Sequence, residues 1–479
     1  MNIRMVLSVL GRVLCIEAVL MLLPMTAGLC YGESPVPFLI TILITALAGM
    51  ALLLMKPKSG EMYAKEGFLC VGLSWITLSL FGALPFVFSG DIPRYTDAFF
   101  ETVSGFTTTG ASVLSDAEAL SRGCMFWRLF THWIGGMGVL VFIMAVLPMS
   151  GEHSMHIMRA EVPGPVVGKL VPRARKTSMI LYSIYLGLTV LQTILLLCGG
   201  MGFYDALLHA FATAGTGGFS TRGLSVGAFD SAYIDIVICV FMLLFSINFN
   251  LYFLILLGKV KAALKSEELW WYIGVVVFAG VTIALNIAEA YGGFVNAMRY
   301  SFFQVASIIS TTGFSTADFN LWPEYSRWLL VSLMFIGGCA GGTGGGMKVS
   351  RLLIMLKSAL GEMVRLIRPH QVTRVTMDGR RLEDSTVRCA SAFGLLYMLI
   401  VIAGTLLMSL DGHDVLTNFT ALIACISNVG PGLGLVGPMG NYDIFSDFSK
   451  WLMSVCMLIG RLEIYPILML VNPALWKKR

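Results

Sequence analysis

The sequence has 479 residues, of which 57% are hydrophobic and 13% charged, and its formal net charge is +5. Soluble domains carry about a quarter of charged residues, so this composition excludes a soluble protein and is typical of an integral membrane protein. Apolar runs of about 20 residues, the length that crosses a hydrocarbon core of roughly 30 Å, recur along the chain. We attribute the small positive charge to membrane topology and predict no nucleic-acid partner.

The first two predicted spans, residues 5–31 and 36–56, form a leading pair. Arg4 and the apolar run behind it resemble a secretory signal peptide, but Glu17 interrupts the run and many further spans follow. We therefore expect this segment to remain as the first helix. Residues 1–60 are predicted to form an N-terminal transmembrane helix pair.

Behind this pair, one plan is repeated four times: an outer span, a short segment that ends in a glycine motif, and an inner span. The outer spans are expected at 67–90, 178–201, 268–290 and 388–410, and the inner ones at 124–149, 231–257, 325–357 and 448–471. The four pore repeats then occupy residues 61–150, 151–262, 263–360 and 361–479. With the leading pair this predicts an all-α polytopic membrane protein with ten transmembrane helices.

The short segments end in related motifs, which are GFTTTGAS from Gly105, AGTGGFST from Ala214, IISTTGFST from Ile308 and the more divergent CISNVGPG from Cys425. When they are aligned on one glycine each, the apolar residues upstream align as well. The chain therefore contains an internal fourfold repeat. Four equivalent backbone segments around one axis are what a carbonyl-lined cation filter requires.

The segment before each motif has about ten apolar residues, which are too few to cross a bilayer. These segments start at Asp97, Asp205, Asn296 and Asn418, and both residue types are good helix N-caps. We predict re-entrant half-helices whose negative C-terminal ends point into the membrane and favour a cation. The alternative is four amphipathic helices that lie on the membrane surface.

After each half-helix the backbone has to run extended at membrane depth, which is tolerated only where it faces protein or a water-filled cavity. Glycine can turn successive carbonyl groups toward an axis because it has no Cβ. The threonine hydroxyls in these loops either add ligands or brace the backbone. The predicted cation-binding residues are Thr108, Thr109, Gly110, Thr216, Gly217, Gly218, Thr311, Thr312, Gly313, Asn428, Val429 and Gly430.

On these motifs the chain resembles the Trk/Ktr/HKT superfamily of potassium transporters, and its leading helix pair makes it most similar to the bacterial TrkH type. The resemblance covers essentially the whole chain and implies one filter glycine per repeat, at Gly110, Gly218, Gly313 and Gly430. The second and fourth motifs read TGG and NVG where the others read TTG. Exact fourfold symmetry is therefore not expected.

The resemblance also implies a cofactor and partners. K⁺ would be the transported ion, with no organic cofactor. We expect a homodimer with a cytoplasmic nucleotide-binding regulatory subunit of the RCK/TrkA kind. That subunit would dock on the basic cytoplasmic face, notably on residues 351–388.

The inner span of the third repeat contains GGCAGGTGGG, residues 337–346. Each glycine costs about 1 kcal/mol relative to alanine in a helix, so the helix should break in mid-membrane, and the resemblance implies an intramembrane gating loop here. The alternative is a close-packed interface of small residues between helices. The predicted gate residues are Gly337, Gly338, Gly341, Gly342, Thr343, Gly344, Gly345, Gly346, Lys348 and Arg461.

Arg461 follows Lys450 by eleven residues, which places it roughly 16 Å along its helix and near the bilayer midplane. An isolated arginine there costs about 2.5 to 3.5 kcal/mol, so Arg461 needs water or a partner on another helix. The resemblance implies an electrostatic barrier below the filter, and a structural ion pair is the alternative. Asn248 and Asn250, also inside a span, either bond to the gating loop or serve helix packing.

Lysine and arginine are concentrated in alternate loops, so the positive-inside rule predicts that both termini are cytoplasmic. The resemblance implies that the membrane is the inner membrane of a bacterium. The segment GGTGGGMKVS imitates a phosphate-binding loop, but Met347 separates Gly346 from Lys348 and no strand precedes it. We therefore do not predict nucleotide binding at this segment.

The ten cysteines stand singly and are predicted to be core residues. His209 is expected to be a packing or hydrogen-bonding residue, and no catalytic constellation is visible.

We therefore predict a potassium uptake protein that is not an enzyme, in which K⁺ passes the filter and the gate down its electrochemical gradient. One alternative is an ion-coupled carrier, a K⁺/Na⁺ or K⁺/H⁺ symporter. The four repeats share one orientation, which favours a pore over a carrier built from inverted repeats. An intramembrane enzyme is the more distant alternative.

Overall fold

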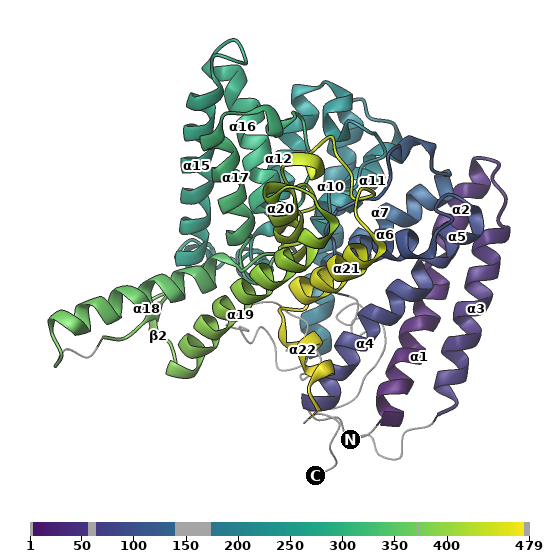
Figure 1. Cartoon of the computed structure of the whole chain (residues 1–479), viewed down its shortest axis with the longest axis horizontal. Coiled ribbons are helices and arrows are strands. Elements are labelled where there is room, and N and C mark those ends of the chain that lie inside the picture. Colours follow the sequence, from purple (N-terminus) through teal and green to yellow (C-terminus); the bar gives the residue numbers. More distant parts are fainter. Residues whose placement is uncertain (1–2, 56–63, 139–173, 371–372, 474–479) are drawn as a thin grey trace.

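The computed structural model describes residues 3–55, 64–138, 174–370 and 373–473, and these residues are mostly helical. The leading pair consists of α1 (Ile3–Leu20), its continuation α2 (Leu22–Cys30) and α3 (Val36–Leu53), which lies beside α1 (Figure 1). Their backbones approach closely, since a Cβ on Gly11 would lie 2.7 Å from the carbonyl oxygen of Gly49. Small residues permit such contacts between membrane helices.

The repeats follow the predicted order of outer helix, half-helix and inner helix. The outer helices are α4 (Ala64–Gly82) with α5 (Leu84–Ser89), α10 (Ala174–Cys198), α15 (Glu267–Ile287) and α19 (Asp384–Met408). The half-helices are α6 (Tyr95–Phe106), α11 (Phe203–Gly215), α16 (Phe294–Ile309) and α20 (Val415–Ile426). The inner helices are α7 (Arg122–Gly136), α12 (Ala232–Ser246) with α13 (Phe249–Leu256), α17 (Glu324–Ile336) with α18 (Val349–Ile367), and α21 (Asp447–Arg461) with α22 (Tyr465–Val471).

Short elements connect these helices. They are α14 (Val260–Ala263), the 3-10 helices η1 (Ala117–Ala119), η2 (Ser225–Phe229), η3 (Phe319–Leu321), η4 (Ser409–Asp411) and η5 (Gly434–Val436), and the strands β1 (Thr376–Met377) and β2 (Arg380–Arg381). The two strands pair antiparallel. Together with α18 they project sideways from the body of the protein (Figure 1).

The half-helices begin earlier than predicted. Asp97 and Asp205 are acidic residues in the first turn of α6 and α11, whose N-caps are Arg94 and Gly202. The predicted caps are therefore wrong, and among the four half-helices only α20 has a side-chain cap, because Asp414 accepts from the backbone N–H of Thr417 at 3.1 Å. Carboxylates inside the first turn still interact favourably with the positive end of a helix.

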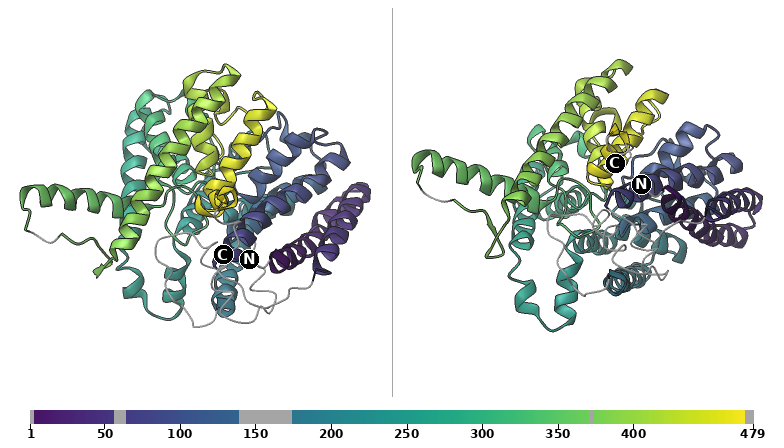
Figure 2. Two further views of the ribbon diagram at one scale, coloured as in Figure 1. Left: turned by 60° about the horizontal axis from the view of Figure 1, so that its bottom comes forward. Right: turned by 90° about the horizontal axis from the view of Figure 1, so that it is seen from below.

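Half-helix α6 is enclosed in the protein, with every residue from Asp97 to Phe106 buried, and α20 is buried from Thr417 to Ile426 except at Phe419. A helix on the membrane surface would leave one face exposed. Seen from below, the four repeats surround the middle of the molecule while the leading pair lies at the periphery (Figure 2).

The inner spans are interrupted more often than predicted. The helix breaks in the glycine-rich loop of the third repeat, as expected, but α12 and α13 also meet at an angle of 92°. A further break between α21 and α22 contains Glu463 and Ile464 at φ angles of 55° and 68°. The continuation of the first inner span over residues 139–149 lies outside the described residues.

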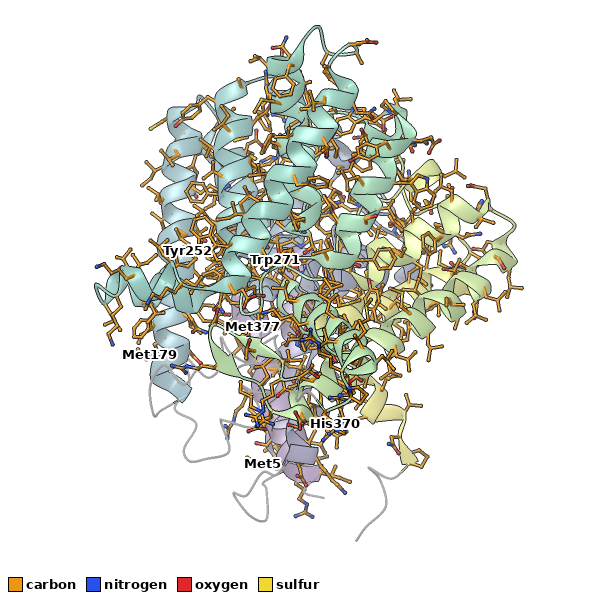
Figure 3. All side chains as sticks on the ribbon, turned by 90° about the vertical axis from the view of Figure 1, so that its left-hand side faces the viewer. Met5, Met179, Tyr252, Trp271, His370 and Met377 are labelled. Carbon is orange, nitrogen blue, oxygen red and sulfur yellow. The ribbon has the colours of Figure 1, made fainter. Side chains whose placement is uncertain are left out.

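Among the described residues, six helices are long and apolar enough to cross a membrane, and the bent pair α12 and α13 would make a seventh. This agrees with an all-α multi-pass membrane protein. The pieces of the interrupted inner helices do not pass such a test individually, because most are too short and α18, with 19 residues, carries too many charged side chains. The total of ten therefore stays a prediction. Met5 of α1, Met179 of α10 and His370 after α18 lie toward the same end of the protein (Figure 3).

Candidate functional site

All four half-helices end in the same turn of the backbone. Thr108, Thr216, Thr311 and Asn428 have φ angles of 55°, 56°, 59° and 56°. Residues with a Cβ seldom adopt this left-handed conformation. In the first repeat, the N–H of Thr109 donates to Ser104 O at 2.9 Å, which is the helix-ending bond of a Schellman motif.

The other three repeats make the same bond, each at 2.8 Å, from Gly217 to Ala212, from Thr312 to Ser307 and from Val429 to Ala424. A strained backbone conformation that recurs in all four copies indicates a functional constraint. Its consequence is that the chain leaves each half-helix in the same direction.

The glycine two residues after each left-handed residue lies against the loop of the following repeat. A Cβ on Gly110 would lie 2.0 Å from the carbonyl oxygen of Gly217, and a Cβ on Gly218 would lie 2.0 Å from the carbonyl oxygen of Thr312. A Cβ on Gly313 would lie 2.1 Å from the carbonyl oxygen of Val429, and a Cβ on Gly430 would lie 2.7 Å from the carbonyl oxygen of Thr109. These contacts run from the first repeat through the second, third and fourth and back to the first. The four loops therefore close into a ring of backbone carbonyls, which brings together the residues predicted to bind a cation.

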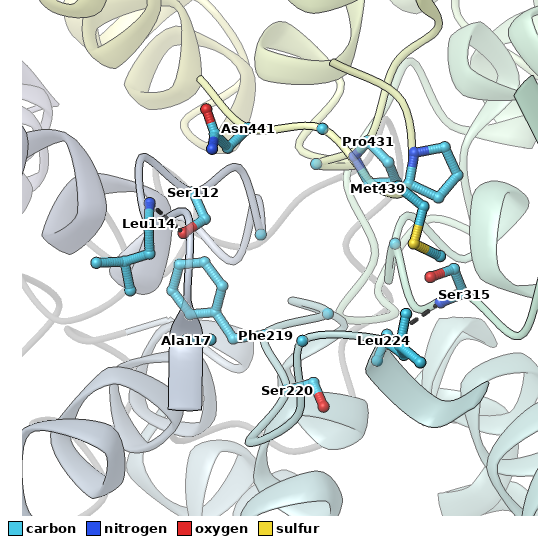
Figure 4. A pocket seen from close by; sticks show the side chains of 18 of the residues that line it. Ser112, Leu114, Ala117, Phe219, Ser220, Leu224, Ser315, Pro431, Met439 and Asn441 are labelled. Atoms are coloured by element: carbon cyan, nitrogen blue, oxygen red, sulfur yellow. Dashed lines mark hydrogen bonds between the residues drawn. The ribbon is translucent and has the colours of Figure 1, made fainter. Parts of the chain in front are cut away.

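A cavity of about 380 Å³ opens directly onto this ring. It is lined by the four glycines and by the extended segments that follow them, among which Ser112, Phe219, Ser315 and Pro431 come one from each repeat (Figure 4). The cavity gives the ring a polar approach from one side of the protein.

Several hydroxyl groups of the predicted filter brace the four loops. Thr109 Oγ1 lies 2.8 Å from Thr107 Oγ1, and Thr312 Oγ1 lies 2.7 Å from Ser310 Oγ at the equivalent place in the third repeat. The side-chain amide of Asn428 donates to Thr109 Oγ1 at 2.9 Å. Hydroxyls that are engaged in this way hold the loops in position.

Two residues that the sequence analysis missed hold the ring from outside. The N–H of Phe219 donates to His132 Nε2 at 3.3 Å, so His132 Nδ1 carries the hydrogen and donates to Gly105 O at 2.7 Å. Tyr442 donates its hydroxyl to Gly430 O at 2.6 Å. A histidine within the apolar run of α7 was the available signal, but nothing near it in the chain identifies its partners.

The loop of residues 337–348 lies immediately beneath the ring. Its φ angles are positive at Gly337, Gly341, Gly346 and Lys348, so a helical interface of small residues is not what these glycines form. Gly345 packs against the end of the fourth half-helix, because a Cβ there would lie 2.3 Å from Ser427 O. A Cβ on Gly344 would lie 2.8 Å from Ser310 O at the end of the third half-helix.

The same loop is bonded into the break of the second inner helix. The N–H groups of Cys339 and Thr343 donate to Ser246 O and Phe245 O at 3.0 and 3.1 Å, and the N–H of Phe249 donates to Gly341 O at 3.0 Å. Asn248 caps α13 by accepting from the N–H of Asn250 at 2.9 Å. Asn248 thus shapes the break with its side chain, and the bonds to the loop come from the backbone beside it.

Glu268 of α15 joins the first part of this loop to the start of α18. Its Oε1 accepts from the N–H groups of Ala340 at 2.8 Å and Ser350 at 3.0 Å, and the residue is buried. Sequence reasoning missed this carboxylate because it stands at the expected end of a span, where a charged residue is ordinary. The side chain of Lys348 is also buried and donates to Gly344 O within the loop.

Arg461 binds backbone carbonyls of two other repeats. Its guanidinium donates to Thr343 O of the loop at 2.7 Å, and to Gly135 O and Gly136 O at the end of α7, both at 2.5 Å. The predicted need for a partner on another helix is met by these carbonyls. Glu463, close to it in the sequence, forms an ion pair with Arg351 of α18.

Together these features define a helical membrane protein in which four half-helix loops close a ring of backbone carbonyls above a glycine-rich loop. A family model described as TrkH, cation transport protein, matches residues 35–268 and 252–478. The chain therefore belongs to the TrkH family of cation transport proteins. The resemblance inferred from the motifs is confirmed, and so is the prediction that the chain is a transport protein and not an enzyme.

Close relatives cover the whole chain. The Trk system potassium uptake protein TrkH of Escherichia coli is 36% identical over 486 residues, and that of Vibrio parahaemolyticus 37% over 487, with 100% of both chains covered in each case. TrkG of Escherichia coli is 32% identical with 99% covered. The crystal structure of the potassium transporter TrkH from Vibrio parahaemolyticus matches with a TM-score of 0.90 at 34% identity and covers 100% of both chains.

Proposed function

We propose that this protein takes up K⁺ across the bacterial cytoplasmic membrane. The observation that carries the proposal is the closed ring at Gly110, Gly218, Gly313 and Gly430, whose neighbouring carbonyl oxygens lie on successive repeats. Rings of backbone carbonyls replace the hydration shell of K⁺ in potassium-selective filters. The names of the relatives, which describe potassium uptake, support the same ion.

Uptake through such a ring needs no chemical energy source. A membrane potential of 100 mV, negative inside, contributes about 2.3 kcal/mol for each K⁺ that enters. The half-helices add a local attraction, because their negative C-terminal ends point at the ring. K⁺ would enter the cavity of about 380 Å³, lose water to the carbonyl oxygens, and move on toward the loop below.

The loop of residues 337–348 and Arg461 form the gate in this proposal. The loop packs under the third and fourth filter loops, and the guanidinium of Arg461 ties it to the end of α7. A positive charge in the path also repels an entering cation. Opening would require the loop to move away from Thr311 and Arg461.

The remaining architecture is proposed as the sequence predicts it. Residues 1–60 form the helix pair, and four repeats with boundaries at 150, 262 and 360 give ten crossings, with both termini in the cytoplasm. The protein would act as a homodimer with a nucleotide-binding subunit on residues 351–388. This surface is supported by the position of α18 and of the hairpin β1–β2, which project from the body (Figure 1).

Growth of a bacterium that lacks its own K⁺ uptake systems tests the function directly. Expression of the chain should restore growth at low K⁺, and a chain that fails to do so although it reaches the membrane would contradict the proposal. Rubidium flux into liposomes then separates the pore from the carrier. Flux that depends on a fixed Na⁺ or H⁺ stoichiometry at zero potential would favour the carrier.

A further inference from the structure

In each half-helix a polar side chain contacts the extended segment that follows the filter glycine, nine residues before that glycine in the first three repeats and ten before it in the fourth. Glu101 accepts from the N–H of Val113 and from Ser112 Oγ, both at 3.0 Å. His209 Nε2 lies 3.0 Å from Ser220 Oγ, and Thr420 Oγ1 accepts from the N–H of Leu433 at 2.9 Å. Gln304 donates to Ala317 O at 3.4 Å.

These residues therefore form a bracing layer, which we define as Glu101, His209, Gln304 and Thr420. Each of them lies behind the ring on its own half-helix and is buried. A filter that separates ions of similar size depends on supporting residues that hold its backbone in place. The bracing layer provides this support in every repeat, but with different chemistry.

In this layer, only the first repeat uses an ion pair. Arg128 of α7 donates from Nε to Glu101 Oε1 at 2.6 Å, and the side chains are 4% and 0% exposed. Arg128 also donates to Ser112 Oγ at 3.1 Å. The carboxylate and the guanidinium thus converge on the extended segment behind Gly110.

Arg128 reaches the second repeat as well. It donates to Ser220 O at 3.3 Å, and its guanidinium carbon lies 3.6 Å from the centre of the Phe219 ring. Ser220 is itself the partner of His209 in the bracing layer. A single buried cation therefore links the extended segments that follow the first and second filter glycines.

Stability alone does not explain this pair, because a buried ion pair can often be replaced by apolar residues without loss of stability. Arg128 also lines the cavity above the ring. Without Glu101, its charge would stand unbalanced beside the entering cations and repel them. The pair thus combines a geometric effect on two loops with an electrostatic one on the cavity.

We propose that Glu101 and Arg128 are positioning residues that set the K⁺ affinity and the K⁺/Na⁺ discrimination of the filter. The proposal rests on the proposed function and specifies which side chains determine its selectivity. Arg128 fixes the first and second filter loops relative to each other, while Glu101 neutralises Arg128 and holds Ser112 and Val113. Neither side chain needs to contact the ion.

The test compares Glu101→Gln, Arg128→Gln and the double variant in liposomes, with rubidium and sodium flux as readouts. Glu101→Gln should raise the KM for K⁺ about tenfold and reduce the K⁺/Na⁺ ratio, because the buried cation is no longer neutralised. Arg128→Gln should reduce the ratio with a smaller change in KM. The double variant should recover the KM for K⁺ but not the K⁺/Na⁺ ratio. This result would separate the effect of the unbalanced charge from the effect of positioning the loops.

A matched control is the pair of Asp235 on α12 and Arg299 on α16, which meet at 2.8 Å with side chains 4% and 29% exposed. In the part of the chain that the structure describes, no hydrogen bond joins this pair to an extended segment behind a filter glycine. Asp235→Asn and Arg299→Gln should lower only the amount of folded protein. The K⁺/Na⁺ ratio should stay as in the unchanged chain.

Ser112→Ala keeps the test decisive if the charge variants do not fold. It removes one hydroxyl that Glu101 and Arg128 share, and the K⁺/Na⁺ ratio should fall about threefold. The inference is overturned if the unchanged protein transports K⁺ while these variants, like the controls, alter only the maximal rate. A folded, unchanged protein without any K⁺ flux would instead overturn the proposed function itself.

Discussion

The hydroxyl oxygen of Thr311 accepts a hydrogen bond of 2.6 Å from the backbone N–H of Gly345. Thr311 is the left-handed residue of the third filter loop, and Gly345 belongs to the glycine-rich loop of residues 337–348. The proposed filter and the proposed gate are therefore joined directly. If the loop moves as proposed, this bond has to break, so the proposed ion pathway and its closure would be coupled at one hydroxyl group.

Replacing Thr311 by valine should make the closed gate less stable. Valine keeps the shape and the backbone strain of threonine but leaves the buried N–H of Gly345 without an acceptor, which costs about 1 to 3 kcal/mol. Basal rubidium flux in liposomes should rise about fivefold or more. Thr311→Ser retains the hydroxyl and serves as the control, and equal basal flux in both variants would contradict the coupling.

Replacing Gly313 by serine should damage the ring. The added Cβ would lie 2.1 Å from Val429 O, so the third and fourth loops have to separate. K⁺/Na⁺ discrimination in flux measurements should fall about tenfold, which corresponds to about 1.4 kcal/mol.

Gly90 provides a matched control for this substitution. Its φ angle of 82° is close to the 85° of Gly313, but a Cβ there would meet nothing within 4 Å. Gly90→Ser therefore introduces the same backbone strain without the collision, and the K⁺/Na⁺ discrimination of this variant should be unchanged. If Gly313→Ser discriminated as well as Gly90→Ser, the filter assignment would fail.

Replacing Arg461 by alanine should release the gate. The change removes three hydrogen bonds to the carbonyls of Thr343, Gly135 and Gly136, together with a charge in the path. Hydrogen bonds from charged groups contribute about 1.5 to 3 kcal/mol each, so we expect at least a tenfold rise in basal flux. The ion pair of half-buried Arg327 with exposed Glu324, both on α17, offers the control Arg327→Ala, which should leave flux unaltered.

Unaltered or lost flux in folded Arg461→Ala protein would show that this arginine is structural. Size-exclusion chromatography of the purified variant establishes folding before flux is measured. The measurement thus decides between the barrier and the structural role that the sequence left open.

Replacing Glu268 by alanine should loosen the first part of the loop from the start of α18. The carboxylate accepts from the N–H groups of Ala340 and Ser350, and both would be left without it. Each unpaired buried N–H costs about 1 to 3 kcal/mol. Protection of the loop amides from hydrogen exchange should fall, and basal flux should rise.

Glu267, the neighbour of Glu268, is the matched control. It pairs with Lys357 at 2.5 Å and is partly exposed. Glu267→Ala should leave loop protection unchanged because such pairs contribute little. Equal protection of the loop amides from hydrogen exchange in both variants would show that Glu268 does not hold the gate.

Local sequence was informative wherever backbone conformation depends on one residue type. The glycines at 110, 218, 313 and 430 all have positive φ angles, and the helix breaks in residues 337–348, as their composition predicts. The half-helix starts were wrong by two or three residues, since Asp97 and Asp205 fit the first turn as well as they fit a cap. The breaks after α12 and α21 carry no comparable cluster of glycines.

The partners of the polar residues could not be predicted. Glu101 and Arg128 are 27 positions apart, and Arg461 meets Gly135 across 326 positions. Charged residues inside apolar runs indicate that a partner exists, but they do not identify that partner.

By itself, the sequence determined that the protein is a multi-pass membrane protein and that a glycine-bearing loop occurs four times. It also determined where the third inner helix breaks. These features follow from hydrophobic composition and from the backbone freedom of single residues, which act locally. The tertiary structure decided that the loops close into one ring, that Thr311 and Arg461 hold the loop below, and that Glu101 and Arg128 brace the first two extended segments. Such contacts join residues distant in the chain, and only the packing of helices brings them within hydrogen-bonding distance.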